Sequence, residues 1–334
     1  MVRVRFAPSP TGSLHVGNAL SAVVNRRAGD WMLLRIDDTD PARNVAGGEE
    51  AILGDLGWLE IDWDEGPARQ SERQDRYREA AERIGTDRFD GVTLLRADGS
   101  ATYHLASVVD DADFGITHVY RGNDHRPNED IHRRLHEALG TTPPEYVHHG
   151  LILGEDGKKL SKRAAGATVA SLRELGFPAG AVRTYLDELG VPRHDVHYDL
   201  ARLRRLAIDA IGAMPDDELA AAADATPEAV PALRGARDLV EAREIARSLL
   251  VTPSPQPSEH PETLLRFHEL RERAPESLDQ TAAKEILREL KAVGGNLKAL
   301  RRALTGADRG PELWTVLVAL PRDEALRRAA VASS

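Results

Sequence analysis

The sequence predicts a doubly wound α/β domain with a parallel sheet, followed by an all-α C-terminal region. Two observations carry this prediction. Strand and helix signals alternate over the first 165 residues, and the strand signals stop beyond about residue 166. Alternation of this kind is typical of a parallel sheet with crossover helices. A glycine-containing loop joins the first strand to the first helix, so the expected domain is Rossmann-like.

The expected elements follow one another along the chain. Residues 2–6 form a strand, and residues 31–36 form a continuous apolar strand of the kind that is buried on both faces. The remaining strands are expected at 117–120 and 146–153, and the helices at 19–27, 49–56, 72–84 and 129–139. Helical periodicity then dominates, as in Leu264, Leu265, Phe267 and Leu270.

Composition excludes several classes of protein. The 334 residues are 41% hydrophobic and 29% charged, which is typical of a soluble globular chain. Cysteine is absent, so neither a disulfide nor a thiolate zinc site is possible, and no zinc is expected. No apolar run has membrane-spanning length and Met1 leads straight into a strand, so we expect a cytoplasmic protein with no membrane partner.

The chain is acidic, with a formal net charge of −10. Residues 201–334 carry 20 basic and 21 acidic side chains, so most of the negative charge lies in residues 1–200. This balance does not favour non-specific nucleic-acid binding. A local basic cluster could dock RNA or could be a solvated helix face; it comprises Arg288, Lys291, Lys298, Arg301, Arg302 and Arg309.

Residues 8–18 between the first strand and the first helix have the composition of a phosphate site. A helix N-terminus exposes unpaired N–H groups and the positive end of the helix dipole. Gly12 and Gly17 allow the backbone to approach a ligand closely, while His15 and Asn18 supply side-chain donors. The alternative is an ordinary strand–loop–helix turn in which these residues only cap the helix.

Several blocks in chain order resemble the glutamyl-tRNA synthetase family of class I aminoacyl-tRNA synthetases. The resemblance begins with residues 5–12 and 14–17 and includes the basic loop at 159–163. The other matching blocks are residues 35–40, 103–106, 108–111, 121–125, 303–306 and 310–313. The resemblance implies the class I catalytic domain, ATP as a substrate, and a Mg²⁺ ion on its phosphates. No carboxylate pair marks a site for that ion, so no metal-binding residues are predicted.

The family's ATP-handling residues transfer to two stretches of this chain. Lys162, assisted by Lys159, is expected to stabilise the charge that develops on the leaving pyrophosphate. An isolated basic loop of this kind would otherwise be a solvated turn. The resemblance implies catalytic roles for His15, Asn18, Lys159 and Lys162, and ATP binding by Pro8, Thr11, Gly12, His15, Gly17, Asn18, Leu160, Ser161 and Lys162.

The resemblance also implies an amino-acid pocket. Arg5 and Arg121 are expected to bind the side-chain carboxylate of the substrate, since arginine can grip a carboxylate with two hydrogen bonds. Outside this context, both arginines would be expected to form surface ion pairs. Asp37 stands where the family usually has a glutamate for the α-ammonium group, and Ser107 is a second departure. The expected amino-acid-binding residues are Arg5, Ala7, Ser9, Asp37, Tyr103, Ser107 and Arg121.

The spacing of the blocks predicts a deletion. The family inserts an acceptor-stem-binding subdomain between the two halves of the nucleotide-binding fold, but only 62 residues separate Asp40 from Tyr103 here. After the helical segment, only residues 85–101 remain, with a turn at Asp98 and Gly99. We predict a catalytic domain at 1–165 with this minimal insertion, a stem-contact and helical subdomain at 166–250, a Pro-rich linker at 251–262, and an anticodon-binding-like subdomain at 263–334.

The function implied by the resemblance is ATP-dependent activation of glutamate, or a close analogue, to an aminoacyl-adenylate with release of pyrophosphate. The acceptor is by family default the 3′ end of tRNA. The deletion leaves open a small-molecule or carrier-protein acceptor. Two further alternatives are a non-catalytic paralogue that binds RNA or protein through its helical region, and a small-molecule nucleotidyltransferase of the same superfamily.

Overall fold

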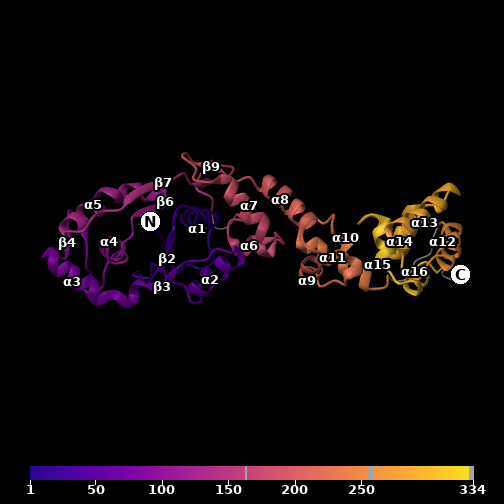
Figure 1. Ribbon diagram of the computed structural model, residues 1–334, viewed down its shortest axis with the longest axis horizontal. Helices are drawn as coiled ribbons and strands as arrows, with labels where there is room; N and C mark the ends of the chain where they lie inside the picture. The colour runs from indigo at the N-terminus through magenta and orange to yellow at the C-terminus, as the bar shows by residue number, and fades with distance from the viewer. Residues whose placement is uncertain (162–163, 254–258, 331–334) are drawn as a thin grey trace. The chain divides into compact units, whose positions relative to one another are not determined.

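The computed structural model describes residues 1–161, 164–253 and 259–330. The chain divides into two compact units. Unit 1 comprises Met1–Glu174 with Val182–Leu200 and contains the strands, whereas unit 2 comprises Leu175–Ala181 with Ala201–Ser334 and is helical (Figure 1). An α/β part followed by an all-α part confirms the predicted fold class.

Unit 1 is built on parallel strands. Strands β1 (Arg3–Phe6), β2 (Trp31–Ile36) and β3 (Glu65–Arg69) pair in that order, and β6 (His118–Gly122) pairs with β7 (Glu145–His149). The Thr117 N–H donates to the Arg3 carbonyl at 2.9 Å, which brings β6 beside β1. The helices of this unit are α1 (Val16–Ala28), α2 (Gly48–Trp58), α3 (Gln74–Ile84), α4 (Tyr103–Asp113), α5 (Glu129–Ala138), α6 (Val169–Glu174) and α7 (Ala179–Leu189).

Two expectations about strands are wrong in detail. Strand β3 was not foreseen, because Gly66 and Pro67 lie within it and both residues weaken strand signals. The run predicted at 146–153 breaks after His149, since the Gly150 N–H donates to the Pro192 carbonyl at 2.7 Å. The chain then forms β8 (Ile152–Leu153), which pairs with β9 (Val196–His197), so strand structure does continue beyond residue 166.

Residues 85–101 form two consecutive turns. Strands β4 (Arg88–Phe89) and β5 (Val92–Thr93) are antiparallel and are joined by Asp90 and Gly91, both with positive φ. The expected turn at Asp98 and Gly99 follows, where the Ser100 N–H donates to the Asp98 carboxylate at 2.9 Å. Leu94 and Ala101 anchor this short segment in the core beside α3, α4 and α5.

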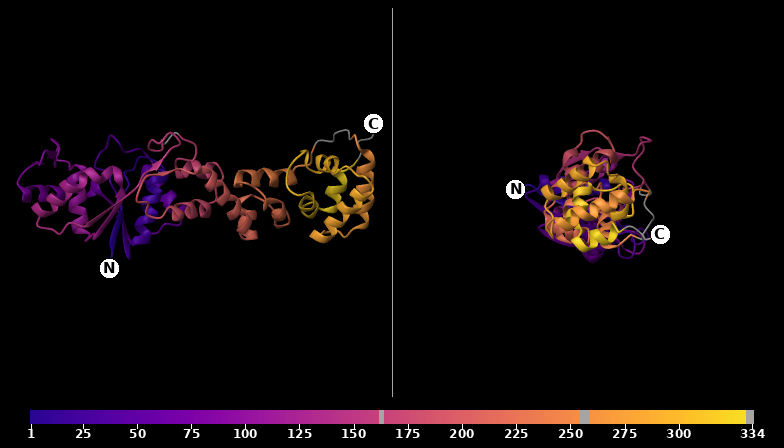
Figure 2. Two further views of the ribbon diagram at one scale, coloured as in Figure 1. Left: turned by 90° about the horizontal axis from the view of Figure 1, so that it is seen from above. Right: turned by 90° about the vertical axis from the view of Figure 1, so that its right-hand side faces the viewer.

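Unit 2 consists of short helices around two connected cores (Figures 1 and 2). One core is formed mainly by α8 (Leu200–Ala213), α9 (Asp216–Ala222), α10 (Val230–Leu233) and α11 (Leu239–Leu250). The other is formed mainly by α12 (Pro261–Arg273), α13 (Gln280–Ala292), α14 (Leu297–Thr305), α15 (Leu313–Ala319) and α16 (Arg322–Arg328). Leu264, Phe267 and Leu270 are buried as the periodicity requires, whereas Leu265 is exposed.

Three residues of the predicted basic cluster have partners close by. Lys298 and Arg302 both pair with Asp308, and Arg301 donates to the Pro311 carbonyl. Part of the predicted linker, residues 254–258, lies outside the described residues. Within the part of the chain that the structure describes, no helix is both long and apolar enough to cross a membrane.

Candidate active site

The first predicted ATP-handling stretch, residues 8–18, here called the first signature, lies at the N-terminus of α1. His15 is the N-cap residue, and its Nδ1 accepts a hydrogen bond from the Gly17 N–H at 3.2 Å. Asn18 is exposed in the first turn, and Gly12 has a φ of 95°, a conformation that favours glycine. The loop therefore leads into a helix whose first turn is capped by His15 and exposes Asn18.

The segment that follows the basic loop contacts the first signature directly. The Val16 N–H donates to the Ala167 carbonyl at 2.9 Å, and the Val169 N–H donates to the Leu14 carbonyl at the same distance. The two predicted ATP-handling stretches are therefore brought close together, although about 140 residues separate them in the sequence.

The basic loop is anchored on its N-terminal side. The Leu160 N–H donates to the Ile152 carbonyl at 3.1 Å, and the Lys159 Nζ lies 2.5 Å from Asp124 Oδ2. Lys159 is thus already paired with a carboxylate in this structure. Ser161 is exposed, and the predicted catalytic residue Lys162 lies outside the described residues.

The side chains of the predicted amino-acid pocket come from one helix face and one sheet face. Tyr103, Ser107 and Asp111 are spaced four residues apart on α4, so they line a single stripe of that helix. Arg5 and Arg35 on β1 and β2 both reach Asp111, and Arg121 on β6 reaches Tyr103. The three arginines therefore lie in the layer between the sheet and α4.

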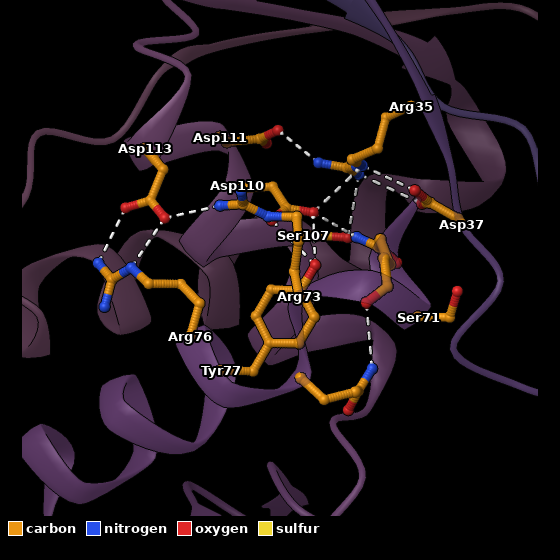
Figure 3. Close-up of polar contacts among 12 residues, drawn as sticks. Arg35, Asp37, Ser71, Arg73, Arg76, Tyr77, Ser107, Asp110, Asp111 and Asp113 are labelled. Carbon is orange, nitrogen blue, oxygen red and sulfur yellow. Dashed lines mark hydrogen bonds and ion pairs between the residues drawn. The ribbon is translucent and has the colours of Figure 1, made fainter. Parts of the chain in front are cut away.

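A buried ion network joins these elements (Figure 3). One oxygen of Asp111 accepts from Arg5 Nε at 3.1 Å and from Arg35 Nη1 at 3.0 Å. Arg35 in turn holds both oxygens of Asp37, at 2.7 and 3.2 Å, and is fully buried. The alternative of surface ion pairing is therefore excluded for Arg5. Asp37 is fixed by Arg35, which determines where its carboxylate can meet a ligand.

Asp110 secures the helix that carries this stripe. Its carboxylate accepts from Gln70 at 2.8 Å, from Arg73 at 2.8 Å and from the Tyr77 hydroxyl at 2.9 Å (Figure 3). Burial raises the pKa of Asp110, and the neighbouring Arg35 and Arg73 oppose that shift. Three partners around one buried carboxylate fix α4 against the segment at 70–77.

Arg121 is the buried arginine of this group that lacks an acid. Its side chain donates to His148 Nε2 at 3.2 Å and approaches the Tyr103 hydroxyl at 3.5 Å. No carboxylate among the described residues pairs with it, and its Nη2 is buried without a hydrogen-bond partner there. The residue is only 6% exposed, and burial lowers its pKa. Such a cation is costly unless a ligand neutralises it.

Neutral histidines surround Arg121. Because His148 Nε2 accepts from Arg121, its proton resides on Nδ1, which lies 3.5 Å from the Glu129 carboxylate. Burial lowers the pKa of His148 to about 4 and that of His132 to about 2, and in both cases Arg121 contributes. These rings therefore add no charge to the pocket at neutral pH.

The lowered pKa values of His132 and His148 lead us to expect that the protein loses stability in acid. In the unfolded chain their pKa is about 6.5, so the unfolded state binds more protons as the pH falls below that value. His132 and His148 should each remove about 2 kcal/mol of unfolding free energy between pH 7 and pH 5. Urea unfolding of wild type and His132→Gln at both pH values measures this effect. The variant should lose about 2 kcal/mol less than wild type, and an equal loss would contradict the assignment.

The predicted amino-acid-binding residues are thus brought close together, although two of them already bind other side chains. The loop containing Ala7 and Ser9 lies beside Asp37, whose N–H donates to the Pro8 carbonyl at 3.0 Å. Asp37 and Arg5 are already engaged by protein partners. Sequence reasoning assigned no role to Arg35, Asp111 or His148. Two features of the sequence could have indicated Arg35 and Asp111. One is an arginine inside an apolar strand, and the other is a pair of adjacent aspartates on an apolar helix.

The described residues contain no group of three or more His, Asp or Glu side chains arranged to hold a metal ion. They therefore do not fit a resident Mg²⁺ site built from protein ligands.

Comparison with known proteins defines the class. The family model described as tRNA synthetases class I (E and Q), catalytic domain, matches residues 1–86 and 83–203. The chain therefore belongs to the class I tRNA synthetases of the E and Q type, and it is a ligase.

The individual proteins that this chain is similar to carry the names of glutamate--tRNA ligases. Glutamate--tRNA ligase 1 of Rubrobacter xylanophilus is 35% identical, over 98% of this chain and 96% of the relative. The glutamate--tRNA ligase of Akkermansia muciniphila is 32% identical over 98% of both. A solved glutamate tRNA ligase from Elizabethkingia meningosepticum, in complex with its amino acid, has the same fold, with a TM-score of 0.76, 24% identity and 98% coverage of both chains.

The comparisons also show that this chain is shorter than the Rubrobacter protein, and that its match to the family model falls into two pieces. The two pieces of the family match meet at residues 83–86, immediately before the β4–β5 turn. The alignment with the Rubrobacter protein spans 418 positions. This chain occupies about 327 of them, which is 98% of its 334 residues. About 91 positions of that relative therefore have no counterpart in this chain.

Proposed function

We propose that this protein activates glutamate with ATP and transfers the glutamyl group to tRNA. The observation that carries the proposal is Arg121, a buried guanidinium with no acid among the described residues. The side-chain carboxylate of glutamate supplies the missing negative charge. The names of the relatives support the same substrates.

The proposed first step joins the two halves of the site. An oxygen of the α-carboxylate attacks the α-phosphorus of ATP, and the bond between that phosphorus and the β-bridging oxygen breaks. Pyrophosphate leaves with the electron pair, and glutamyl-adenylate remains. The side chains of His15 and Asn18 and the positive end of the α1 dipole attract the phosphates, and Lys162 offsets charge on the leaving oxygens.

In the proposed second step, a ribose hydroxyl at the tRNA 3′ end attacks the activated carbonyl, and AMP leaves. A second candidate acceptor is a small amine, a hydroxyl compound or a carrier protein. It is favoured by one observation, that residues 85–101 hold only two short turns where the family match breaks. Too few residues remain in this segment for a domain that cradles an RNA end.

The test is pyrophosphate exchange with glutamate, glutamine and aspartate, each with and without total tRNA, followed by labelling of tRNA with radioactive glutamate. Glutamate-dependent exchange and labelled tRNA are expected. Exchange without labelled tRNA would favour the second acceptor, and exchange with none of the amino acids would overturn the proposal. Aspartate or glutamine as the preferred substrate would reassign the pocket.

Lys162 carries a prediction of its own. The Lys162→Ala variant should lower the rate of adenylate formation by about 10²–10³-fold, because one donor to the transition state is lost. Single-turnover formation of glutamyl-adenylate measures this rate. The matched control is Lys158→Ala, which removes an exposed lysine from the same loop and should leave the rate within about twofold. An equal loss in both variants would mean that only general positive charge matters.

A further inference from the structure

Tyr146 lies beneath Arg121 but has no role in the activity described so far. In the parallel register of β6 and β7, Val119 pairs with Tyr146 and Arg121 pairs with His148. Paired residues of neighbouring strands share a face of the sheet. Tyr146 therefore points into the same layer as Arg121, toward α4.

The ring of Tyr146 packs against two guanidinium groups. The Arg121 Cζ lies 4.8 Å from the ring centroid, and the Arg133 Cζ lies 5.0 Å from it. These distances are within the range of cation–π attraction. The ring thereby helps to orient Arg121, the cation that the proposed function assigns to the substrate.

The hydroxyl of Tyr146 is a second unused donor in this layer. It is buried and has no hydrogen-bond partner among the described residues, which is also true of Arg121 Nη2. Burial and the charge of Asp111 raise the pKa of Tyr146, whereas Arg5 and Arg121 oppose that shift, so the hydroxyl lies within reach of the charges that line this layer. An unpaired buried donor destabilises the protein, and a ligand that supplies an acceptor would remove that cost.

We propose that the Tyr146 hydroxyl donates a hydrogen bond to the side-chain carboxylate of the amino-acid substrate and makes the pocket select an acid over its amide. This inference rests on the proposed function. Arg121 offers only donors, and the phenol proton of Tyr146 adds another. A carboxylate presents acceptors to both groups, whereas the NH₂ group of an amide cannot accept from Arg121 and could meet the hydroxyl only if that hydroxyl gave up its role as donor.

The test compares wild type, Tyr146→Phe and Tyr120→Phe in ATP- and amino-acid-dependent pyrophosphate exchange with glutamate and glutamine, in the presence of total tRNA. Tyr146→Phe should lower kcat/KM for glutamate by about 10–100-fold through KM, narrow the preference for glutamate over glutamine, and leave the KM for ATP unchanged. Tyr120, the residue before Arg121 on β6, points to the other face and is the matched control.

Two readouts separate this inference from simpler explanations. The thermal midpoint of Tyr146→Phe should equal or exceed that of wild type, because the lost hydroxyl has no protein partner to lose. Wild-type activity with glutamate tests the proposed function by itself. If wild type uses glutamate and Tyr146→Phe retains its kcat/KM and its preference, the assignment of Tyr146 is overturned while the proposed function stands. Inactive wild type would overturn both.

Discussion

Replacing Arg121 by alanine is expected to lower kcat/KM for glutamate by about 10³-fold, because truncating one partner of a buried charge pair costs about 2–5 kcal/mol. The loss should appear in the KM for glutamate, with the KM for ATP unchanged. Arg121→Lys keeps the charge but not the planar fork, so its activity should lie between those of wild type and Arg121→Ala. Pyrophosphate exchange at varied glutamate concentration measures all three proteins.

Stability distinguishes a ligand-binding role of Arg121 from a structural one. No carboxylate among the described residues pairs with its guanidinium, so removing the charge should leave the unfolding free energy equal or higher. Arg134→Ala, which removes an ion-paired arginine from the outer side of α5, is the control and should retain full activity. A less stable but normally active Arg121→Ala protein would contradict the proposed site.

Replacing Arg35 by methionine is expected to destabilise unit 1 by about 3–5 kcal/mol, since the change leaves buried carboxylates without their shared cation. Arg35 contacts Asp37 at 2.7 Å and Asp111 at 3.0 Å, and lies 3.6 Å from Asp110. Methionine fills a similar volume, so the effect reports the charge. Arg78→Met removes an exposed ion pair with Asp75 and should cost less than about 1 kcal/mol.

Fluorescence can report on unit 1 alone. Three of the four tryptophans, Trp31, Trp58 and Trp63, lie in that unit, and Trp314 lies in unit 2. Urea unfolding in a Trp314→Phe background therefore follows the strand-containing unit. If Arg35→Met unfolds at the same urea concentration as its background protein, the buried network does not stabilise the fold.

The parts of the fold that were predictable are those in which local pattern and burial agree. Strand β2 has the predicted bounds because all six of its residues suit a buried strand. Arg35 suits this position because it pairs with buried aspartates. Strand β3 was missed because glycine and proline conceal a strand whose partner is distant in sequence. The break after His149 depends on a hydrogen bond from Gly150 to Pro192, and no local pattern encodes a partner 42 residues away.

The candidate site shows the same division. The family resemblance led to Arg5, Tyr103 and Arg121, which the fold gathers in one layer. It could not show that Asp37 is held by Arg35, because that pairing depends on side-chain direction inside the layer. Nor could it show that Arg121 lacks an acid. The absence of a partner is a property of three-dimensional packing, not of a sequence window.

The arrangement of the three arginines on separate strands also affects how the chain folds. If β1 or β2 slipped by one residue, its arginine, Arg5 or Arg35, would turn to the opposite face, which is lined by apolar residues such as Val4 and Phe6, and Asp111 on α4 would lose a partner. Both errors would bury an unpaired charge. The charged residues of the proposed substrate pocket therefore also favour the correct strand register. A misaligned sheet would be less stable even when no substrate is bound.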